Sequence, residues 1–341
     1  MKKVLLLLVS LTLVISVLTG CSADKEGNTI VIAWYPNESG TELKAARDEI
    51  GSLIAKATGK NVEHKLTTDY NITIEAVATG NAHIAFTGAE GYIQANKKNA
   101  KILPLVVNAG KSGTLDDAIY YSWLSVKKGN EDQYKSGDDY VIDNIQGKRF
   151  SFVSNSSTSG FRVPSAGIIN HFSSQDKWKN LMSDQLIEGG SDKFFSEVLF
   201  GGSHQGSAIS LLTEKADVAA FCDTCVANYV EFSSGTENKP GAVYKVRDNA
   251  DEPFNTVPGA EFVLISVTPV LNAPFICNTE VLSENSRKAI IDAMTSAETT
   301  NNQKIFVPKD AAFKGLWAKT GDERFLTVQD EWFNPIRELS K

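Results

Sequence analysis

The sequence has few of the residues that metal centres and nucleic-acid interfaces need. Its 341 residues include four cysteines and four histidines, and acidic residues outnumber basic ones by 41 to 34. His64, His83 and His171 show no metal-ligand spacing, and the one C-x-x-C motif has no second motif to complete a zinc site. The chain also lacks internal repeats and long low-complexity segments. We therefore expect no metal, and the acidic balance argues against a nucleic-acid partner, which attracts clustered basic charge.

The one long apolar run predicts a signal peptide over residues 1–20. Two lysines precede Val4–Leu18, which is almost wholly apolar but too short to span a membrane, and small residues then lead to Cys21. This ending resembles the lipobox of bacterial lipoproteins. The resemblance implies that Cys21 carries a lipid and anchors the protein at the extracytoplasmic face of the cell membrane, with residues 21–28 as a tether. Loss of the leader's two lysines takes the formal net charge from −7 to −9.

The rest of the chain alternates apolar strands with amphipathic helices. Thr29–Tyr35 is an apolar segment that ends at a proline, and the next segment carries a helical apolar stripe closed by Gly59, a typical C-terminal cap. Further segments continue the pattern as strand, helix, strand, helix and strand, at residues 62–67, 70–80, 82–88, 92–98 and 101–107. This alternation predicts an α/β fold with largely parallel strands.

Two further apolar strands, Tyr120–Val126 and Glu261–Val267, enclose a middle unit of the same kind. They predict that the chain crosses twice between two lobes. We expect a first lobe formed by residues 29–120 and 267–341, and a second lobe formed by residues 121–266 with the crossing strands at its edges. Such an architecture suits a ligand clamp that closes about a hinge.

A run of hydroxyl residues separates the strand-like "RFSFV" from the helix-like "FRVPSAGIINHF". Ser157, Thr158 and Ser159 have side chains that cap helices and populate turns, which is one interpretation. The other is that their hydroxyls and the free N–H groups of a helix start hold an oxyanion, which the helix dipole favours. Gly160 would let the backbone approach the anion, and Pro164 is tolerated in a first helical turn. No lysine is required, because neutral dipoles hold an anion and still release it.

Several segments together resemble the phosphate/phosphite/phosphonate-binding proteins of ABC transporters. These are "DNIQGKRFSFVSNSSTSGFRVP", "GGSHQGSAISLLTEKADVAAF", "ISVTPVLNAPFICNTEVLSENSRKAI" and "AVATGNAHIAFTGAEGY". The similarity runs, with gaps, over most of residues 30–339. It implies a two-lobed, type II periplasmic-binding-protein fold with two crossing strands, no catalysis, no cofactor, and an ABC permease and its ATPase as partners. It also implies a small oxyanion ligand held between the lobes by Ser157, Thr158, Ser159 and His204.

Three other positions are candidate ligand contacts. Tyr121 matches an aromatic residue on the family's first crossing strand, although it is equally well explained as a hinge-core residue. Thr87 stands in a turn where phosphonate-binding members carry a tyrosine and an asparagine, and its hydroxyl could donate instead. Asp223 could replace a carboxylate that those members use for the ligand's amine. These departures leave the identity of the ligand open among phosphate, phosphite, phosphonates and similar oxyanions.

His204 is expected in a loop that follows an aromatic-rich helix, where a change of its charge near neutral pH would make anion affinity depend on pH. The structural alternative is a surface histidine or one with satisfied hydrogen bonds.

Cys222 and Cys225 support a rival function. A C-x-x-C pair after a strand occurs in thiol-disulfide oxidoreductases, whereas in an oxidising compartment the pair forms a small disulfide loop or packs beside the cleft. A ligand-sensing lipoprotein that retains the fold is a third alternative.

Overall fold

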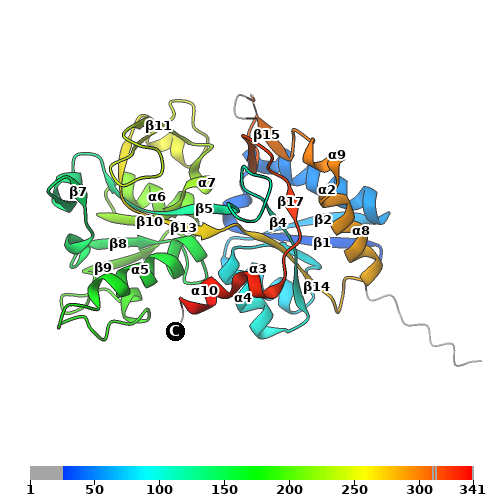
Figure 1. Ribbon diagram of the computed structural model, residues 1–341, viewed down its shortest axis with the longest axis horizontal. Coiled ribbons are helices and arrows are strands. Elements are labelled where there is room, and N and C mark those ends of the chain that lie inside the picture. The colour runs from blue at the N-terminus through cyan, green and yellow to red at the C-terminus, as the bar shows by residue number, and fades with distance from the viewer. Residues whose placement is uncertain (1–25, 309–310, 312, 340–341) are drawn as a thin grey trace, which may run out of the picture.

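The computed structural model describes residues 26–308, 311 and 313–339, and in it the chain forms two α/β lobes side by side (Figure 1). The predicted signal peptide, the predicted lipidation site Cys21 and most of the predicted tether lie outside the described residues. Among the described residues, the structure contains no helix long and apolar enough to cross a membrane.

The first lobe is built on a six-stranded sheet in the order β17-β4-β14-β3-β1-β2. Strand β1 pairs in parallel with β2 and β3, whereas β14 is antiparallel to both β3 and β4. Helices α2 and α8 pack on one face of this sheet, and α3, α4 and α10 pack on the other. The strands are β1 (Thr29–Trp34), β2 (Asn61–Leu66), β3 (Ile84–Phe86), β4 (Ile102–Asn108), β14 (Pro274–Asn278) and β17 (Phe325–Leu326). The helices are α2 (Lys44–Thr58), α3 (Tyr70–Ala78), α4 (Ala89–Lys98), α8 (Glu284–Met294), α9 (Ala297–Thr300) and α10 (Asn334–Glu338).

The second lobe is built on a seven-stranded sheet in the order β11-β12-β13-β5-β10-β8-β9. Helix α5 packs on one face through Ile168 and Phe172, and α6 packs on the other through Ala208 and Leu211. The strands are β5 (Ile119–Lys127), β8 (Arg149–Phe152), β9 (Glu197–Phe200), β10 (Val218–Cys222), β11 (Val230–Ser234), β12 (Val243–Val246) and β13 (Glu261–Leu271). The helices are α5 (Val163–Phe172), α6 (His204–Leu212) and α7 (Asp223–Val226). Two small two-stranded sheets join β6 (Lys135–Ser136) to β7 (Asp139–Tyr140) and β15 (Phe306–Pro308) to β16 (Trp317–Lys319).

Strands β5 and β13 are the two connections that the sequence predicts between the lobes. They pair antiparallel along their whole length, from Phe262 opposite Lys127 to Leu271 opposite Ile119 (Figure 1). The boundaries predicted at 120/121 and 266/267 fall inside these two strands. A paired ribbon of this kind gives the lobes a common hinge.

Local sequence explains how the elements end. Helix α2 ends at Gly59, whose φ of 70° lies in the left-handed region that glycine adopts without strain, as predicted.

The prediction of an aromatic-rich helix before His204 is wrong, because residues 197–200 form the short strand β9 at the edge of the second sheet. A run of apolar and aromatic residues this short is compatible with either a strand or a helix, so the aromatic content of residues 194–200 could not decide between the two.

Candidate functional site

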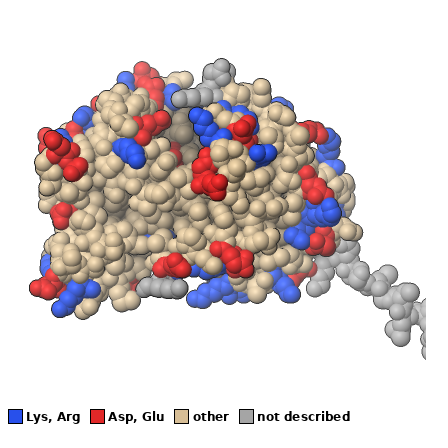
Figure 2. Space-filling model, viewed as in Figure 1, with Lys and Arg blue, Asp and Glu red and all other residues tan. Residues whose placement is uncertain are grey.

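A cavity of about 420 Å³ lies between the lobes, and residues from both lobes line it. Hydroxyl and aromatic groups dominate its inner part: Tyr35, Tyr70, Thr87, Tyr120, Ser157, Thr158, Ser159 and His204. Lys111 is the one lysine or arginine among the described lining residues, and it is exposed. On the face shown in Figure 2, acidic and basic residues are scattered rather than gathered in one patch. The cavity therefore offers an anion neutral donors instead of fixed positive charge.

The hydroxyl run lies at the start of a helix whose first turn is a π-turn, Thr158–Arg162, continuous with α5. Pro164 explains this start, because it has no N–H to donate to the carbonyl oxygen of Gly160. That oxygen instead accepts a hydrogen bond from the Val153 N–H at 3.2 Å. Ser157, Thr158 and Ser159 at this helix start line the cavity.

Ser157 has the capping role that the sequence left open, and it lies where the other role, oxyanion binding, would place it. Its Oγ accepts the Gly160 N–H at 3.0 Å and so caps the helix, while the residue lines the cavity and is 1% exposed. Thr158 makes a different contact: its Oγ1 accepts the backbone N–H of Glu90, in α4 of the first lobe, at 2.9 Å. Thr158 thus joins the two lobes at the cavity wall.

Ser159 is held by the first crossing strand. Its Oγ accepts a hydrogen bond from the Tyr120 hydroxyl at 3.1 Å, and its carbonyl oxygen accepts one from the Ser122 hydroxyl at 2.6 Å. Ser157, Thr158 and Ser159 thus lie together on the wall of one cavity, as predicted from the sequence.

His204 is the first residue of α6, is 3% exposed, and lines the same cavity. Its backbone N–H donates to Asn37 Oδ1 at 2.9 Å, and its Nδ1 accepts the Cys222 N–H at 3.0 Å. An Nδ1 that accepts leaves the proton of the neutral ring on Nε2, which lies 3.4 Å from Ser157 Oγ. Burial lowers the pKa of His204 to about 3. The ring is therefore a neutral donor near neutral pH, and the expected change of its charge in that range is wrong.

The first lobe contributes groups that sequence reasoning missed. Tyr35 directly follows β1, and its buried hydroxyl has no protein partner; Tyr70 accepts a hydrogen bond from Asn37 Nδ2 at 2.6 Å. Thr87, which the sequence did single out, follows β3, is fully buried, and its Oγ1 also lacks a protein partner. Tyr35 and Thr87 stand beyond the carboxyl ends of neighbouring parallel strands, a common ligand position in open α/β sheets. That rule, applied to the predicted strand Thr29–Tyr35, could have found Tyr35.

Four carboxyl groups lie at or near the site: Glu38, Asp117 and Glu323 line the cavity, and Asp223 lies close to it. Glu38 lines the cavity with one buried oxygen that has no protein partner, and burial raises its pKa to about 8. The Asp223 side chain does not line the cavity; it accepts the Tyr121 N–H at 2.9 Å, and burial raises its pKa to about 7. The structure thus brings six of the seven predicted contacts to the cavity, Tyr121 among them, and leaves Asp223 behind its wall.

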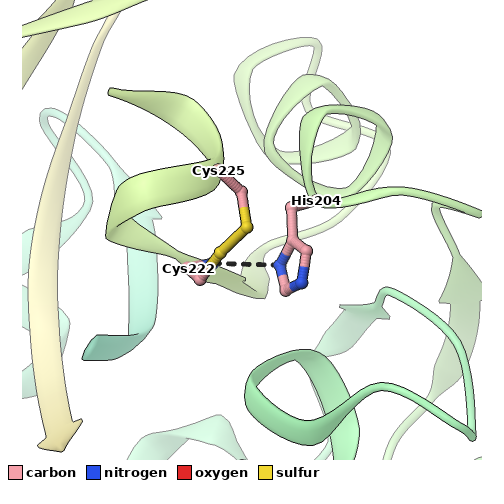
Figure 3. A group of neighbouring side chains, drawn as sticks. All are labelled: His204, Cys222 and Cys225. Carbon is pink, nitrogen blue, oxygen red and sulfur yellow. Dashed lines mark hydrogen bonds between the residues drawn. A yellow bond between two sulfur atoms is a disulfide. The ribbon is translucent and has the colours of Figure 1, made fainter. Parts of the chain in front are cut away.

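Cys222 and Cys225 form a disulfide beside His204 (Figure 3). Cys225 lines the cavity, whereas Cys222 is fully buried; the remaining described cysteine, Cys277, is free and buried in β14. The sulfur atoms and a ring nitrogen of His204 lie within 4.8 Å of one another, but both sulfurs are used by the disulfide. Of the two arrangements that the sequence left open, the structure contains the small disulfide loop.

Contacts between the lobes close the cavity. Asn37 receives a hydrogen bond from the His204 N–H, and Glu90 forms a largely buried ion pair with Arg162 at 2.8 Å. At the outer rim, Lys314 pairs with Asp251 at 2.5 Å, and the Tyr229 hydroxyl donates to Glu42. The two lobes are therefore in a closed arrangement.

Comparison with known proteins places this two-lobed cavity in a family. The sequence pattern of the periplasmic substrate-binding proteins of ABC phosphonate transporters matches residues 32–333. The chain belongs to this family. A curated relative of this chain is the phosphate-import protein PhnD of Mycolicibacterium smegmatis, 30% identical over 210 residues. That match covers 60% of this chain and 59% of the relative's length.

Solved structures of the phosphonate-binding family share the fold. The binding component of a phosphonate ABC transporter from Pseudomonas aeruginosa has a TM-score of 0.62 at 19% identity, with 91% of this chain and 85% of that chain covered. PhnD1 of Prochlorococcus marinus, solved with methylphosphonate, has a TM-score of 0.61 at 14% identity, covering 92% and 97%. The predicted family and the predicted two-lobed α/β fold are confirmed, and family members are substrate-binding components of transporters rather than enzymes.

Proposed function

We propose that this protein is the lipid-anchored, extracytoplasmic binding component of an ABC importer, and that it binds phosphate, phosphite, a phosphonate or a similar small oxyanion in the cavity between its lobes. One observation carries the proposal: buried neutral donors from both lobes converge there, at the starts of α5 and α6. Ser157, Thr158, Ser159 and His204 supply one side, and Tyr35 and Thr87 supply the other with hydroxyls that have no protein partner.

The electrostatics suit a carrier that must release its cargo. Helix starts favour negative charge, and hydrogen bonds to a charged ligand contribute roughly 1.5–3 kcal/mol each. Without a buried lysine or arginine, the attraction depends on all donors being in place, which happens when the lobes are closed. Opening of the lobes then weakens the site without any chemical step.

The cavity volume bears on the kind of oxyanion. About 420 Å³ falls in the usual range of small-molecule sites, roughly 300–1,000 Å³, and exceeds what a single tetrahedral anion fills. Beyond the donors, the wall continues over Tyr121, Leu316 and Trp317. This favours an oxyanion with an organic substituent, such as a phosphonate, over bare phosphate.

A thermal-shift screen followed by calorimetric titration tests the proposal. The panel contains phosphate, phosphite, methylphosphonate, aminoethylphosphonate and sulfate. A ligand at about 100 times its Kd should stabilise the folded protein by about 2.7 kcal/mol. We expect at least one phosphorus oxyanion to raise the melting temperature and sulfate to do much less. No shift with any phosphorus compound, at millimolar concentration, would contradict the proposal.

The disulfide keeps the thiol-disulfide oxidoreductase as a second candidate. Cys222 is fully buried and Cys225 lines the cavity between the lobes, however, whereas a pair that exchanges with partner proteins needs a sulfur that those proteins can reach. We expect no reductase activity in an insulin-reduction assay with a dithiol. Turnover that is lost in Cys222→Ala would instead support the enzyme.

A further inference from the structure

The Cys222–Cys225 turn has no part in the proposed function so far. It nevertheless makes three hydrogen bonds to residues of the candidate site or their neighbours. The Cys222 N–H donates to His204 Nδ1 at 3.0 Å, and the Cys225 carbonyl oxygen accepts from Gln205 Nε2 at 3.2 Å. Asp223, between them, accepts the N–H of Tyr121 at 2.9 Å. Each of these contacts fixes a residue of the cavity wall or its neighbour.

Cys222 ends β10 and pairs with Ser122 of β5, but helix formation does little to hold the turn that follows it. Helix α7 has four residues, Asp223–Val226, and isolated helices of this length are unstable in water. Its N-cap residue is Cys222, whose side chain makes no capping hydrogen bond and is instead bonded to Cys225, one turn further on. The disulfide therefore links the N-cap residue to the first turn of α7, where a capping hydrogen bond makes this link in other helices.

The contact to His204 is the one that decides what the ring offers a ligand. An imidazole with an accepting Nδ1 donates through Nε2, whereas the other tautomer would present a lone pair to an anion and repel it. Figure 3 shows the ring beside the disulfide, with the dashed bond from the backbone of Cys222 to the ring. The ring is almost completely buried, so no bulk water replaces this N–H if it moves.

We propose that the Cys222–Cys225 disulfide is a positioning element of the oxyanion site, which holds the Cys222 N–H on His204 Nδ1 and so keeps Nε2–H directed to the ligand. The expected effect on oxyanion affinity rests on the proposed function. The expected effect on the tautomer of His204 is independent of it. Reduction by an external dithiol transfers two electrons and two protons to the pair, gives two thiols, and leaves the reagent as its own disulfide. The protein with an open pair then binds the oxyanion less tightly.

A double-mutant cycle tests the coupling. Cys222→Ala/Cys225→Ala is compared with the unchanged protein, and again in a His204→Ala background, by calorimetry with methylphosphonate and with phosphate. We expect loss of the disulfide to weaken binding roughly tenfold when His204 is present and less than about twofold when it is absent, because coupled residues are not additive. Cys277→Ala, a buried cysteine outside the cavity wall, is the matched control and should leave the affinity unchanged. An equal loss in both backgrounds, or no loss in either, overturns the proposal.

A second measurement does not depend on the ligand. In ¹⁵N NMR of the ring nitrogens, His204 should be the Nε2–H tautomer in the disulfide form and a mixture in the double alanine variant and in the dithiol-reduced protein. A chelator is present throughout, because the reduced sulfurs and His204 lie close enough together to capture a divalent metal. An unchanged tautomer contradicts the inference even if methylphosphonate and phosphate bind. Failure of the unchanged protein to bind any oxyanion contradicts the proposed function alone.

Discussion

At the scale of single residues, the hydroxyl run both makes structural hydrogen bonds and lines the cavity. Ser157 caps a helix and lines the cavity, and Thr158 joins the lobes and lines the cavity. A residue pattern could reveal the hydroxyls and the helix start. It could not reveal that Thr158 accepts from Glu90, because that bond joins residues 68 positions apart and exists only when the lobes meet.

Replacing these hydroxyls separates the two roles. Ser157→Ala with Thr158→Ala should lower oxyanion affinity a hundredfold or more, since each lost bond to a charged group costs roughly 1.5–3 kcal/mol and about 1.4 kcal/mol is tenfold. Unfolding of the ligand-free protein should change by about 1 kcal/mol for the lost Ser157 cap and by about 1–3 kcal/mol for the Glu90 N–H that Thr158→Ala leaves unpaired. Calorimetric titration and melting of the ligand-free protein give both values.

Ser283→Ala is the matched control for that experiment. Ser283 caps α8 by accepting the Ser286 N–H at 3.2 Å and does not line the cavity. The Ser283→Ala variant should therefore lose about 1 kcal/mol of unfolding free energy, the contribution of one cap, and keep its affinity for the oxyanion. Near-normal affinity in the Ser157/Thr158 double variant would show that the hydroxyl run is only a cap.

Glu38, rather than His204, should set the pH dependence of binding. The pKa of Glu38 is raised to about 8, so the carboxyl is neutral at pH 7 and becomes negative above pH 8, where it repels an anion in the same cavity. The pKa of His204, at about 3, keeps that ring neutral over this range. Affinity should therefore fall as the pH rises through 8, and Glu38→Gln should flatten the fall. Calorimetry from pH 6 to 9.5 checks this; parallel profiles for the two proteins would contradict it.

At the scale of elements, the sequence predicted most of what hydrophobic periodicity and glycine caps can specify. The strand Thr29–Tyr35, the helix that ends at Gly59 and both crossing strands appear within one to four residues of their predicted ends. The π-turn before α5 was missed because the Gly160 carbonyl oxygen accepts its hydrogen bond from the Val153 N–H, outside the helix, and the sequence does not reveal that contact. The side chain of Asp223 was expected at the ligand and instead binds the backbone of β5. Such tertiary hydrogen bonds leave no periodic signal in a sequence.

Helix α4 and the π-turn before α5 are joined by the Glu90–Arg162 pair. Because this pair is largely buried, removal of Arg162 leaves an uncompensated carboxylate, and closure becomes less favourable. We expect Arg162→Gln to speed ligand release and lower affinity roughly tenfold, and Glu90→Gln/Arg162→Gln to recover part of the loss. Stopped-flow release measures the rates.

A surface pair provides the control for this effect. Lys288 and Asp292 form an exposed ion pair on α8, distant from the cavity wall, and Lys288→Gln should leave ligand release unchanged. If Arg162→Gln behaves like Lys288→Gln, the Glu90–Arg162 pair does not contribute to closure.

At the scale of the whole molecule, two lobes joined by one paired ribbon should close around ligand as rigid bodies. We expect small-angle scattering to give a smaller radius of gyration with saturating ligand than without it, and the liganded profile to fit the closed arrangement. Identical profiles for the two states would contradict a clamp. The Ser157/Thr158 double variant at the same ligand concentration is the control and should keep the profile of the ligand-free protein.

The proposed anchor is tested on the complete precursor. Cys21→Ala removes the thiol to which the lipid would attach, so we expect the unchanged protein to enter the detergent phase in Triton X-114 partitioning and the variant to remain in the aqueous phase. Equal partitioning of both would contradict lipidation at Cys21.

The strand order of the first sheet has a consequence for how the chain acquires its structure. Strand β14, Pro274–Asn278, lies between β3 and β4, so the middle of that sheet stays incomplete until about four fifths of the 341-residue chain has emerged. All seven strands of the second sheet lie between Ile119 and Leu271 and are complete before β14 appears. In N-to-C synthesis or export the second lobe can therefore fold first, while the first lobe, begun earlier, finishes last.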